Sequence, residues 1–199
     1  GGIIHNLSLD IAPGEKVGLV GRSGAGKSTL VNLLLRFYDL EKGRILIDGS
    51  DISGLPMYRR ARLGIGYSPE DAGIFPDLTV AENLMISEWL VAEKAKTSSE
   101  SAVADTEARI YSVFPEVRSL TARRGLNLSG GQKKMVAVAR AMALLPSLLL
   151  LDEAFEGLAP VVVNRFRDAV NKIKELGISI LIAESNVVTA AAVADRLYA

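Results

Sequence analysis

Residues 21–28 read GRSGAGKS and match the pattern G-x-x-x-x-G-K-[S/T] at every position. A short apolar run at residues 17–20 (VGLV) precedes this stretch, and an apolar segment with helical character follows it at residues 28–37. A glycine-rich turn between a buried strand and a helix is the context in which this pattern cradles phosphate. Glycines let successive backbone N–H groups turn inward, and the helix adds the positive end of its dipole. The stretch therefore predicts a phosphate-binding loop in an α/β fold.

The residue types in this loop predict its ligand. Lys27 supplies a mobile positive charge for the β- and γ-phosphates of a nucleotide, and the Ser28 hydroxyl suits Mg²⁺. A glycine-rich turn that binds nothing has no need of Lys-Ser directly after its last glycine. The nucleotide-binding residues that we predict are Gly21, Arg22, Ser23, Gly24, Ala25, Gly26, Lys27, Ser28 and Thr29.

A second stretch, residues 148–153, reads LLLLDE and predicts a buried strand that ends in two carboxylates. Ligands of open α/β sheets bind at the carboxyl ends of the strands. Asp152 is therefore predicted to hold Mg²⁺ through its water shell, and Glu153 to polarise the water that attacks the γ-phosphate. Taken alone, an ordinary strand with acidic loop residues explains the stretch equally well, and the phosphate loop upstream favours the catalytic interpretation.

Composition excludes several other classes of protein. The chain has 199 residues, 23 Lys+Arg against 23 Asp+Glu, no cysteine and one histidine, His5. Zero net charge argues against a nucleic-acid-binding face. The cysteine and histidine counts exclude disulfide scaffolds, thiolate catalysis and multi-histidine metal sites. The longest apolar stretch, residues 141–151, contains Pro146 and Ser147 and falls short of the ~20 residues that a membrane span needs. We expect a soluble, intracellular protein without a secretory signal.

Along the chain, strand and helix patterns alternate, which favours an open and mainly parallel sheet. Residues 78–126 lack strand signals and are predicted to be a helical insertion, with an exposed turn at residues 96–105 (KTSSESAVAD). Strands are predicted at residues 7–11, 17–20, 44–48, 64–67, 148–151 and 178–183. Helices are predicted at residues 28–37, 58–63, 82–96, 106–114, 129–145, 160–176 and 187–197.

A third motif identifies a family. Residues 128–132 read LSGGQ, lie between the phosphate loop and the acidic pair, and precede Lys133-Lys134 and an Ala/Val-rich helix. Three motifs in this order over nearly the whole chain resemble the ATP-binding-cassette (ABC) ATPases. The resemblance implies an α/β fold with a P-loop NTPase core, a mainly parallel sheet, a small antiparallel β part and an inserted helical subdomain. Residues 1–199 would form one domain, with residues 1–77 and 127–199 as the core and residues 78–126 as the helical subdomain.

The resemblance also implies a function and partners. The chain would bind and hydrolyse Mg-ATP as the nucleotide-binding domain of an ABC membrane transporter. It would pair head to tail with a second copy or a second ABC subunit, and Ser129, Gly130, Gly131 and Gln132 would meet the γ-phosphate held by that subunit. The helical subdomain would dock on transmembrane permease subunits, which places the protein in the cytoplasm, peripheral to the inner membrane. No nucleic-acid partner is expected.

Four residues depart from the family pattern, of which Ala154, in place of a proline directly after Glu153, is the smaller change. Glu70 stands where the family has a glutamine that links Mg²⁺ and the attacking water to the helical subdomain, so we expect a metal ligand of weaker catalytic effect. Ser185 stands where many members have a histidine that touches the γ-phosphate, and a hydroxyl can take this catalytic position without carrying charge. Ala159 replaces an aspartate in the loop after Glu153, which puts signalling between subunits in doubt.

Subfamily features are mixed. Residues 5–49 resemble the nucleotide-binding domain of an exporter, whereas residues 57–199 resemble the ATP-binding subunit of a branched-chain amino-acid importer. A chimera with a seam near residues 50–56 is one interpretation, and a natural sequence with an unusual mixture is the other. Both ends look shorter than in the family. The alternative function is therefore an engineered or truncated chimeric chain that binds nucleotide phosphate with little or no ATPase activity.

Overall fold

Five parallel strands form the central sheet of this computed structural model, which describes residues 4, 6–22, 24–95 and 99–199. Their order in the sheet is β4 (Ile65–Ser68), β5 (Leu148–Asp152), β6 (Ser179–Glu184), β1 (Lys16–Val20) and β7 (Arg196–Tyr198). All four neighbouring pairs are parallel, so the carboxyl ends of the strands share one edge. A separate antiparallel pair joins β2 (Leu46–Ile47) to β3 (Ser50–Asp51). The predicted fold class, a mainly parallel α/β sheet with a small antiparallel part, is confirmed.

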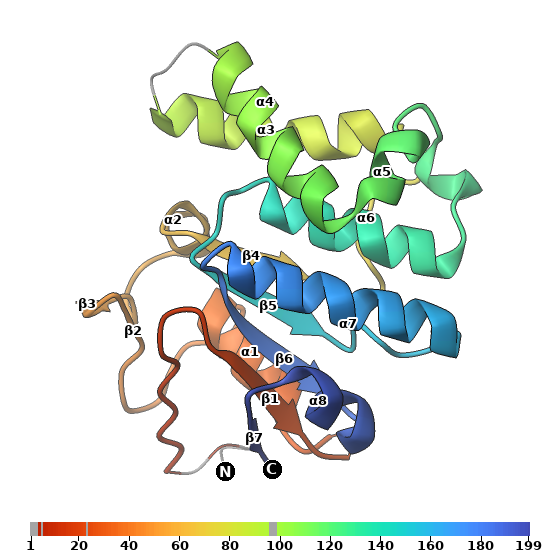
Figure 1. Cartoon of the computed structure of the whole chain (residues 1–199). Helices are drawn as coiled ribbons and strands as arrows, with labels where there is room; N and C mark the ends of the chain where they lie inside the picture. The colour runs from red at the N-terminus through yellow and green to blue at the C-terminus, as the bar shows by residue number, and fades with distance from the viewer. Residues whose placement is uncertain (1–3, 5, 23, 96–98) are drawn as a thin grey trace.

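Helices cover both faces of this sheet (Figure 1). The two faces follow from the alternation of side chains along buried strands, since Leu150 and Leu181 point to one side and Leu149 and Ile180 to the other. Helix α1 (Lys27–Leu35) packs on the first side, and the other side carries α6 (Gly130–Met142), α7 (Pro160–Glu175) and α8 (Val187–Val193). Unbroken apolar strands are what a sheet covered on both faces requires.

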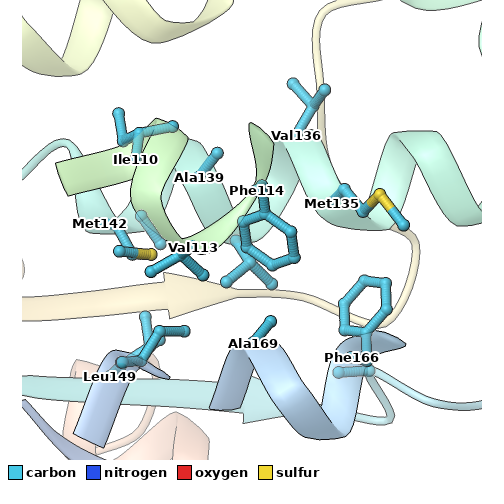
Figure 2. Packing of buried hydrophobic residues seen from close by; sticks show 14 of the residues in the cluster. Ile110, Val113, Phe114, Met135, Val136, Ala139, Met142, Leu149, Phe166 and Ala169 are labelled. Carbon is cyan, nitrogen blue, oxygen red and sulfur yellow. The ribbon is translucent and has the colours of Figure 1, made fainter. Parts of the chain in front are cut away.

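The larger core lies on the α6 and α7 side, and Figure 2 shows its centre. Phe114 and Phe166 are tilted against each other with ring centroids 5.7 Å apart, and Phe155 meets Phe166 edge-on at 6.0 Å. Phe114 lies between α4 and α5, Phe155 in the turn after β5, and Phe166 on α7, so the rings come from segments far apart in the sequence. Aromatic contacts of this kind add to the apolar burial that holds the helices onto the sheet.

Residues 80–127 contain helices and no sheet strand among the part that the structure describes. They form α3 (Val80–Ala95), α4 (Ser99–Val113), α5 (Pro115–Leu120) and a 3₁₀ turn at Gly125–Asn127. The two ends of this segment lie side by side, because Thr79 and Arg124 form an antiparallel bridge and the Gly125 N–H donates to the Leu78 carbonyl at 2.8 Å. Within the described residues, no helix combines the length and the apolar character needed to cross a membrane.

Arg60 on α2 (Met57–Arg62) stabilises the α1 side of the sheet from within. Its side chain is 2% exposed. The guanidinium donates to the carbonyls of Leu33 and Leu34 at 2.7 and 2.8 Å, and to those of Ser53 and Leu55 at 2.7 and 3.1 Å. Two of these carbonyls belong to the last turn of α1, whose C-terminal carbonyls lack partners inside the helix. A buried arginine therefore replaces water at this helix end.

Of the two strands predicted at residues 7–11 and 44–48, the first is wrong and the second is shorter than predicted. Residues 7–11 keep the predicted alternation, with Leu9 and Ile11 half-buried, but they pair with no strand. Of residues 44–48, only Leu46 and Ile47 are in a strand. Alternation alone sets which side chains face the core, whereas a strand also needs a neighbour for its backbone hydrogen bonds.

Three further differences between prediction and structure concern helices. The turn predicted at residues 96–105 is helical from Ser99, and residues 96–98 lie outside the described part. Helix α5 was not predicted. The last predicted helix, residues 187–197, ends at Val193, and residues 196–198 form β7 beside β1. The helix ends there because the Asp195 carboxylate accepts from the Lys16 N–H at 2.9 Å, which draws the chain against the sheet.

Candidate functional site

The loop after β1 has the backbone that a phosphate-binding turn requires. Gly24 and Gly26 have φ values of +83° and +94°, a region that L-residues with a side chain rarely adopt. Gly26 is the N-cap of α1, and the helix begins at Lys27. Ser23 lies outside the described residues. The free N–H groups at the start of α1 and its dipole point toward the edge where the strands end.

Lys27, Ser185 and Glu153 converge at this edge. The Lys27 ammonium donates to the carbonyls of Gly21 and Arg22 at 2.7 and 3.3 Å. It also donates to the Ser185 hydroxyl at 3.2 Å and lies 3.5 Å from the Glu153 carboxylate. Ser185 in turn donates its hydroxyl to Glu153 Oε1 at 2.5 Å and its backbone N–H to Oε2 at 2.9 Å. The hydroxyl therefore bridges the ammonium and the carboxylate.

Glu153 and Glu184 form a buried carboxyl pair, 8% and 2% exposed. Burial, and then the hydrogen bond to Glu153, raises the pKa of Glu184 to about 7. Burial would also raise the pKa of Glu153, but the hydrogen bonds from Ser185 and Glu184 outweigh it and lower that pKa. Two adjacent carboxylates cannot both ionise cheaply, so Glu184 holds the proton and Glu153 carries the charge. The arrangement keeps Glu153 an acceptor, as a water-orienting residue must be.

Asp152 lies beside this pair at the end of β5 and is 6% exposed. Burial, followed by the charges of Glu153 and Glu70, raises its pKa. Tyr67 hydrogen-bonds to it, and burial together with the Asp152 charge raises the pKa of Tyr67 to about 12. The Asp152 Oδ1 atom is buried and has no hydrogen-bond partner among the described residues. A buried unsatisfied carboxylate oxygen is costly, and a cation is the partner that it fits.

Glu70 lies two residues after β4 and is exposed at the same edge. Its charge contributes to the raised pKa values of Asp152 and Tyr67. The following turn is held by Arg140 of α6, which donates to the Gly73 carbonyl at 2.7 Å and stacks over the Phe75 ring. The structure therefore places Glu70 within electrostatic range of the acidic pair, on a loop attached to α6.

The LSGGQ motif forms the N-terminus of α6. Ser129 is the N-cap: its hydroxyl accepts from the Gln132 N–H at 3.3 Å, and its own N–H donates to the Gln132 side chain at 3.0 Å. This capping box explains two of the motif's polar residues without any ligand. Gly131 is explained by packing, since a Cβ there would lie 3.1 Å from Val162. A Cβ on Gly130 would meet nothing within 4 Å, so packing within the chain does not account for that glycine.

Helices α1 and α6 begin at the same edge of the sheet on opposite faces. Both helices run antiparallel to the strands, whose carboxyl ends hold the site residues. Helix α6 contacts the site through Lys134. The Lys134 ammonium donates to the carbonyls of Glu153 and Glu156 at 2.6 and 2.9 Å. The phosphate loop and the LSGGQ motif thus present two helix N-termini that are separated by the thickness of the sheet.

A cavity of about 1100 Å³ in the described part of the chain does not belong to this site. It lies on the α1 side, between α1, the extended N-terminal segment and β2, and its lining is largely apolar side chains such as Leu30 and Leu34. Of the predicted nucleotide-binding residues that the structure describes, Thr29 alone lines it.

The structure brings together Lys27, Asp152, Glu153 and Ser185, with Glu70 close by; the roles predicted for them stay predictions. The motifs did not identify Glu184, Tyr67 or Lys134. Glu184 had a sequence signal, because it is an acidic residue that ends a buried strand directly before Ser185. Tyr67 and Lys134 had no comparable signal.

Comparison with known proteins gives consistent matches. The family model described as "ABC transporter" matches residues 4–156. A probable ABC transporter ATP-binding protein of Azorhizobium caulinodans is 36% identical over 196 residues, which cover 98% of this chain and 68% of that protein. The lipopolysaccharide export system ATP-binding protein LptB of Escherichia coli K12 is 36% identical over 200 residues, covering 98% and 79%.

Solved structures agree with these sequence matches. The ADP conformation of an ATP-binding cassette of an ABC transporter superimposes with a TM-score of 0.79 at 25% identity, over 96% of this chain and 78% of that one. A dimeric post-hydrolysis state of an ATP-binding cassette, bound to ADP and phosphate, has a TM-score of 0.81 at 25% identity, over 96% and 83%.

Proposed function

This chain belongs to the ABC transporter family and is an ATPase domain of the ABC type, and we propose that it hydrolyses Mg-ATP at a site completed by a second subunit to drive a membrane transporter. The observation that carries the proposal is the convergence of Lys27, Ser185 and Glu153 beside the unpartnered oxygen of Asp152. Phosphoryl transfer to water needs a positive charge for the phosphates, an ionised acceptor that orients the water and a ligand for Mg²⁺. Lys27, Glu153 and Asp152 would supply these three groups in turn.

In this proposal Lys27, Glu153 and Ser185 have different roles. Lys27 binds the β- and γ-phosphates in place of the carbonyls of Gly21 and Arg22. Glu153, kept ionised by Ser185 and Glu184, accepts a hydrogen bond from the attacking water and orients it. The Ser185 backbone N–H holds the Glu153 carboxylate, which leaves the single hydroxyl proton of Ser185 for one hydrogen bond to the γ-phosphate.

The residues present fit a magnesium ion. Mg²⁺ usually keeps several waters and is held by one or two carboxylates together with substrate phosphates. Asp152 offers a buried unsatisfied oxygen, and Ser28 and Glu70 offer further oxygens. Magnesium supplies charge neutralisation between the β- and γ-phosphates. Among the described residues, no group of three or more His, Cys, Asp or Glu side chains is placed to hold a metal by itself.

The second anion site supports pairing with another subunit. Ser129 and Gly130 stand at the N-terminus of α6, on the opposite face of the sheet from α1. A second copy, or a second ABC subunit, arranged head to tail would bring that N-terminus to the γ-phosphate held by Lys27. A related cassette forms a dimer in a post-hydrolysis state bound to ADP and phosphate, which supports pairing of two chains.

The helices of residues 78–126 are the proposed contact with transmembrane permease subunits. On α3, Trp89 is 61% exposed and Met85 lies one turn before it, so this helix leaves apolar side chains uncovered. Such a contact places the domain on the cytoplasmic side of the inner membrane. The related LptB proteins carry lipopolysaccharide export in their names, and the solute transported with the present chain is set by its membrane subunits.

One observation favours a second candidate, a chain that binds nucleotide phosphate with little turnover. Both oxygens of Glu153 are occupied by Ser185, and Gln132 is occupied by Ser129. A site in which these bonds persist would bind phosphate without orienting water.

Turnover of Mg-ATP over a range of protein concentrations separates the two, with Lys27→Ala as the blank. Turnover above the blank that rises faster than linearly with protein concentration is expected for a site shared between two chains. Turnover equal to the blank, while nucleotide still binds, would favour the second candidate.

A further inference from the structure

Lys134 joins two parts of the site that the proposed mechanism assigns to different nucleotides. It lies in the second turn of α6, five residues after the N-cap Ser129. Its ammonium donates to the carbonyls of Glu153 and Glu156 at 2.6 and 2.9 Å, so it holds both ends of the turn that follows β5. The packing of Gly131 against Val162 brings the same helix end close to the start of α7.

The backbone of Glu153 depends on contacts of this kind. Its φ is +46°, in the left-handed region that residues other than glycine rarely adopt. Such a conformation persists only where the surroundings enforce it. The Glu153 N–H is fixed by the Ala183 carbonyl at 2.8 Å, within the sheet. Its carbonyl accepts from the Glu156 N–H of the same turn at 3.2 Å and, at the shorter distance of 2.6 Å, from Lys134, which comes from a helix outside the sheet.

We propose that Lys134 is a positioning residue that couples the two nucleotide sites of the dimer. The inference rests on the proposed function. Ser129 and Gly130, at the start of α6, contact the nucleotide of the partner, whereas Glu153 acts on the nucleotide of its own chain. Lys134 connects these two groups within one chain, so that engagement of the α6 N-terminus by the partner's γ-phosphate moves the Glu153 carbonyl and aligns its carboxylate. Coupling of this kind makes turnover cooperative in ATP.

The first test compares three variants in ATP turnover as a function of ATP concentration. Lys134→Met removes the ammonium and keeps the stem, Lys134→Arg keeps charged donors, and Lys133→Met removes the same charge one residue earlier. Among the described residues, Lys133 has no hydrogen bond or ion pair to the Glu153 turn, so it is the matched control.

We expect Lys134→Met to lower kcat by about tenfold to a hundredfold with KM within about twofold, because a small misplacement of a catalytic group has effects of this size. The Hill coefficient for ATP falls from above one to one. Lys134→Arg recovers most of kcat, and Lys133→Met behaves as the wild type. A Lys134→Met variant with wild-type kcat and Hill coefficient, or a wild type that lacks cooperativity, would overturn the coupling.

The second test does not depend on turnover. Amide hydrogen exchange of residues 153–158 is measured without nucleotide in the wild type, Lys134→Met and Lys133→Met. Exchange about tenfold faster in Lys134→Met alone is expected, since the turn loses the side-chain contact that ties both of its ends to α6. Unchanged exchange would overturn the inference whatever the activity. An inactive wild type combined with faster exchange in Lys134→Met would refute the proposed function and support the tie between α6 and Glu153.

Discussion

Raising the pH from about 5 to about 8 is expected to lower the free energy of unfolding of this protein, because Glu184 must give up a proton that the folded state holds. Glu184 is 2% exposed, and burial and the hydrogen bond to Glu153 raise its pKa from 4.5 to about 7. A raised pKa means that the native state binds the proton more tightly than the unfolded chain does. The resulting stability is fully present below about pH 4.5 and is lost as the pH rises through about 7.

The size of the effect follows from the same two values. A difference between 4.5 and about 7, at about 1.4 kcal/mol per pH unit, corresponds to about 3 kcal/mol in the free energy of unfolding. Glu184→Gln keeps an amide donor for Glu153 and cannot ionise. The free energy of unfolding of this variant is therefore expected not to fall by this amount as the pH rises. Burial also raises the pKa values of Asp152 and Glu88, but both residues are present in both proteins.

Urea unfolding at about pH 5, 6, 7 and 8, without metal or nucleotide, gives the free energy of unfolding by linear extrapolation. The wild type is expected to lose about 2.5 kcal/mol more than Glu184→Gln between the two ends of this range, since part of the effect lies below pH 5. Curves that stay parallel within about 0.5 kcal/mol, the precision of such extrapolations, would refute the assignment of the shared proton to Glu184.

Two further predictions concern packing. Arg60→Met is expected to lower the free energy of unfolding by about 3 kcal/mol, because four carbonyls lose a buried charged donor, whereas exposed Arg59→Met changes it by less than about 0.5 kcal/mol. Equal losses in the two variants, measured by urea unfolding, would contradict the role of Arg60. Gly66→Ala is expected to cost about 1–3 kcal/mol, since its Cβ would lie 2.9 Å from the Ala141 carbonyl of α6, and Gly54→Ala, in open space, is the control. A thermal midpoint of Gly66→Ala equal to that of Gly54→Ala would show that α6 does not rest on β4 this closely.

The sequence predicts the sheet well where apolar runs are buried on both faces, as in β1, β5 and β6. The sequence predicts the bounds of strands and helices less well where contacts between distant segments determine them. The helical pattern of residues 187–197 continues past Val193, but Asp195 is drawn to Lys16 and Lys174 and the chain turns into β7. The N-terminal alternation likewise sets the facing of Leu9 and Ile11 without supplying a strand neighbour.

The same division holds in the site. Lys27, Asp152 and Glu153 could be identified because their motifs are local in sequence. The pairing of Glu153 with Glu184 depends on the register of β5 and β6, in which Asp152 lies opposite Ala183. The contact of Lys134 with the Glu153 carbonyl depends on how α6 packs, and no local pattern encodes it.

The central claim is that two chains share each nucleotide. Sedimentation velocity of Glu153→Gln, with and without Mg-ATP, tests it most directly, because a site that binds ATP without orienting water keeps the nucleotide between the subunits. Glu153→Gln is expected to become a dimer with Mg-ATP, and Lys27→Ala is expected to stay a monomer under the same conditions. A Glu153→Gln chain that binds Mg-ATP by calorimetry and yet sediments as a monomer at every concentration would contradict the claim.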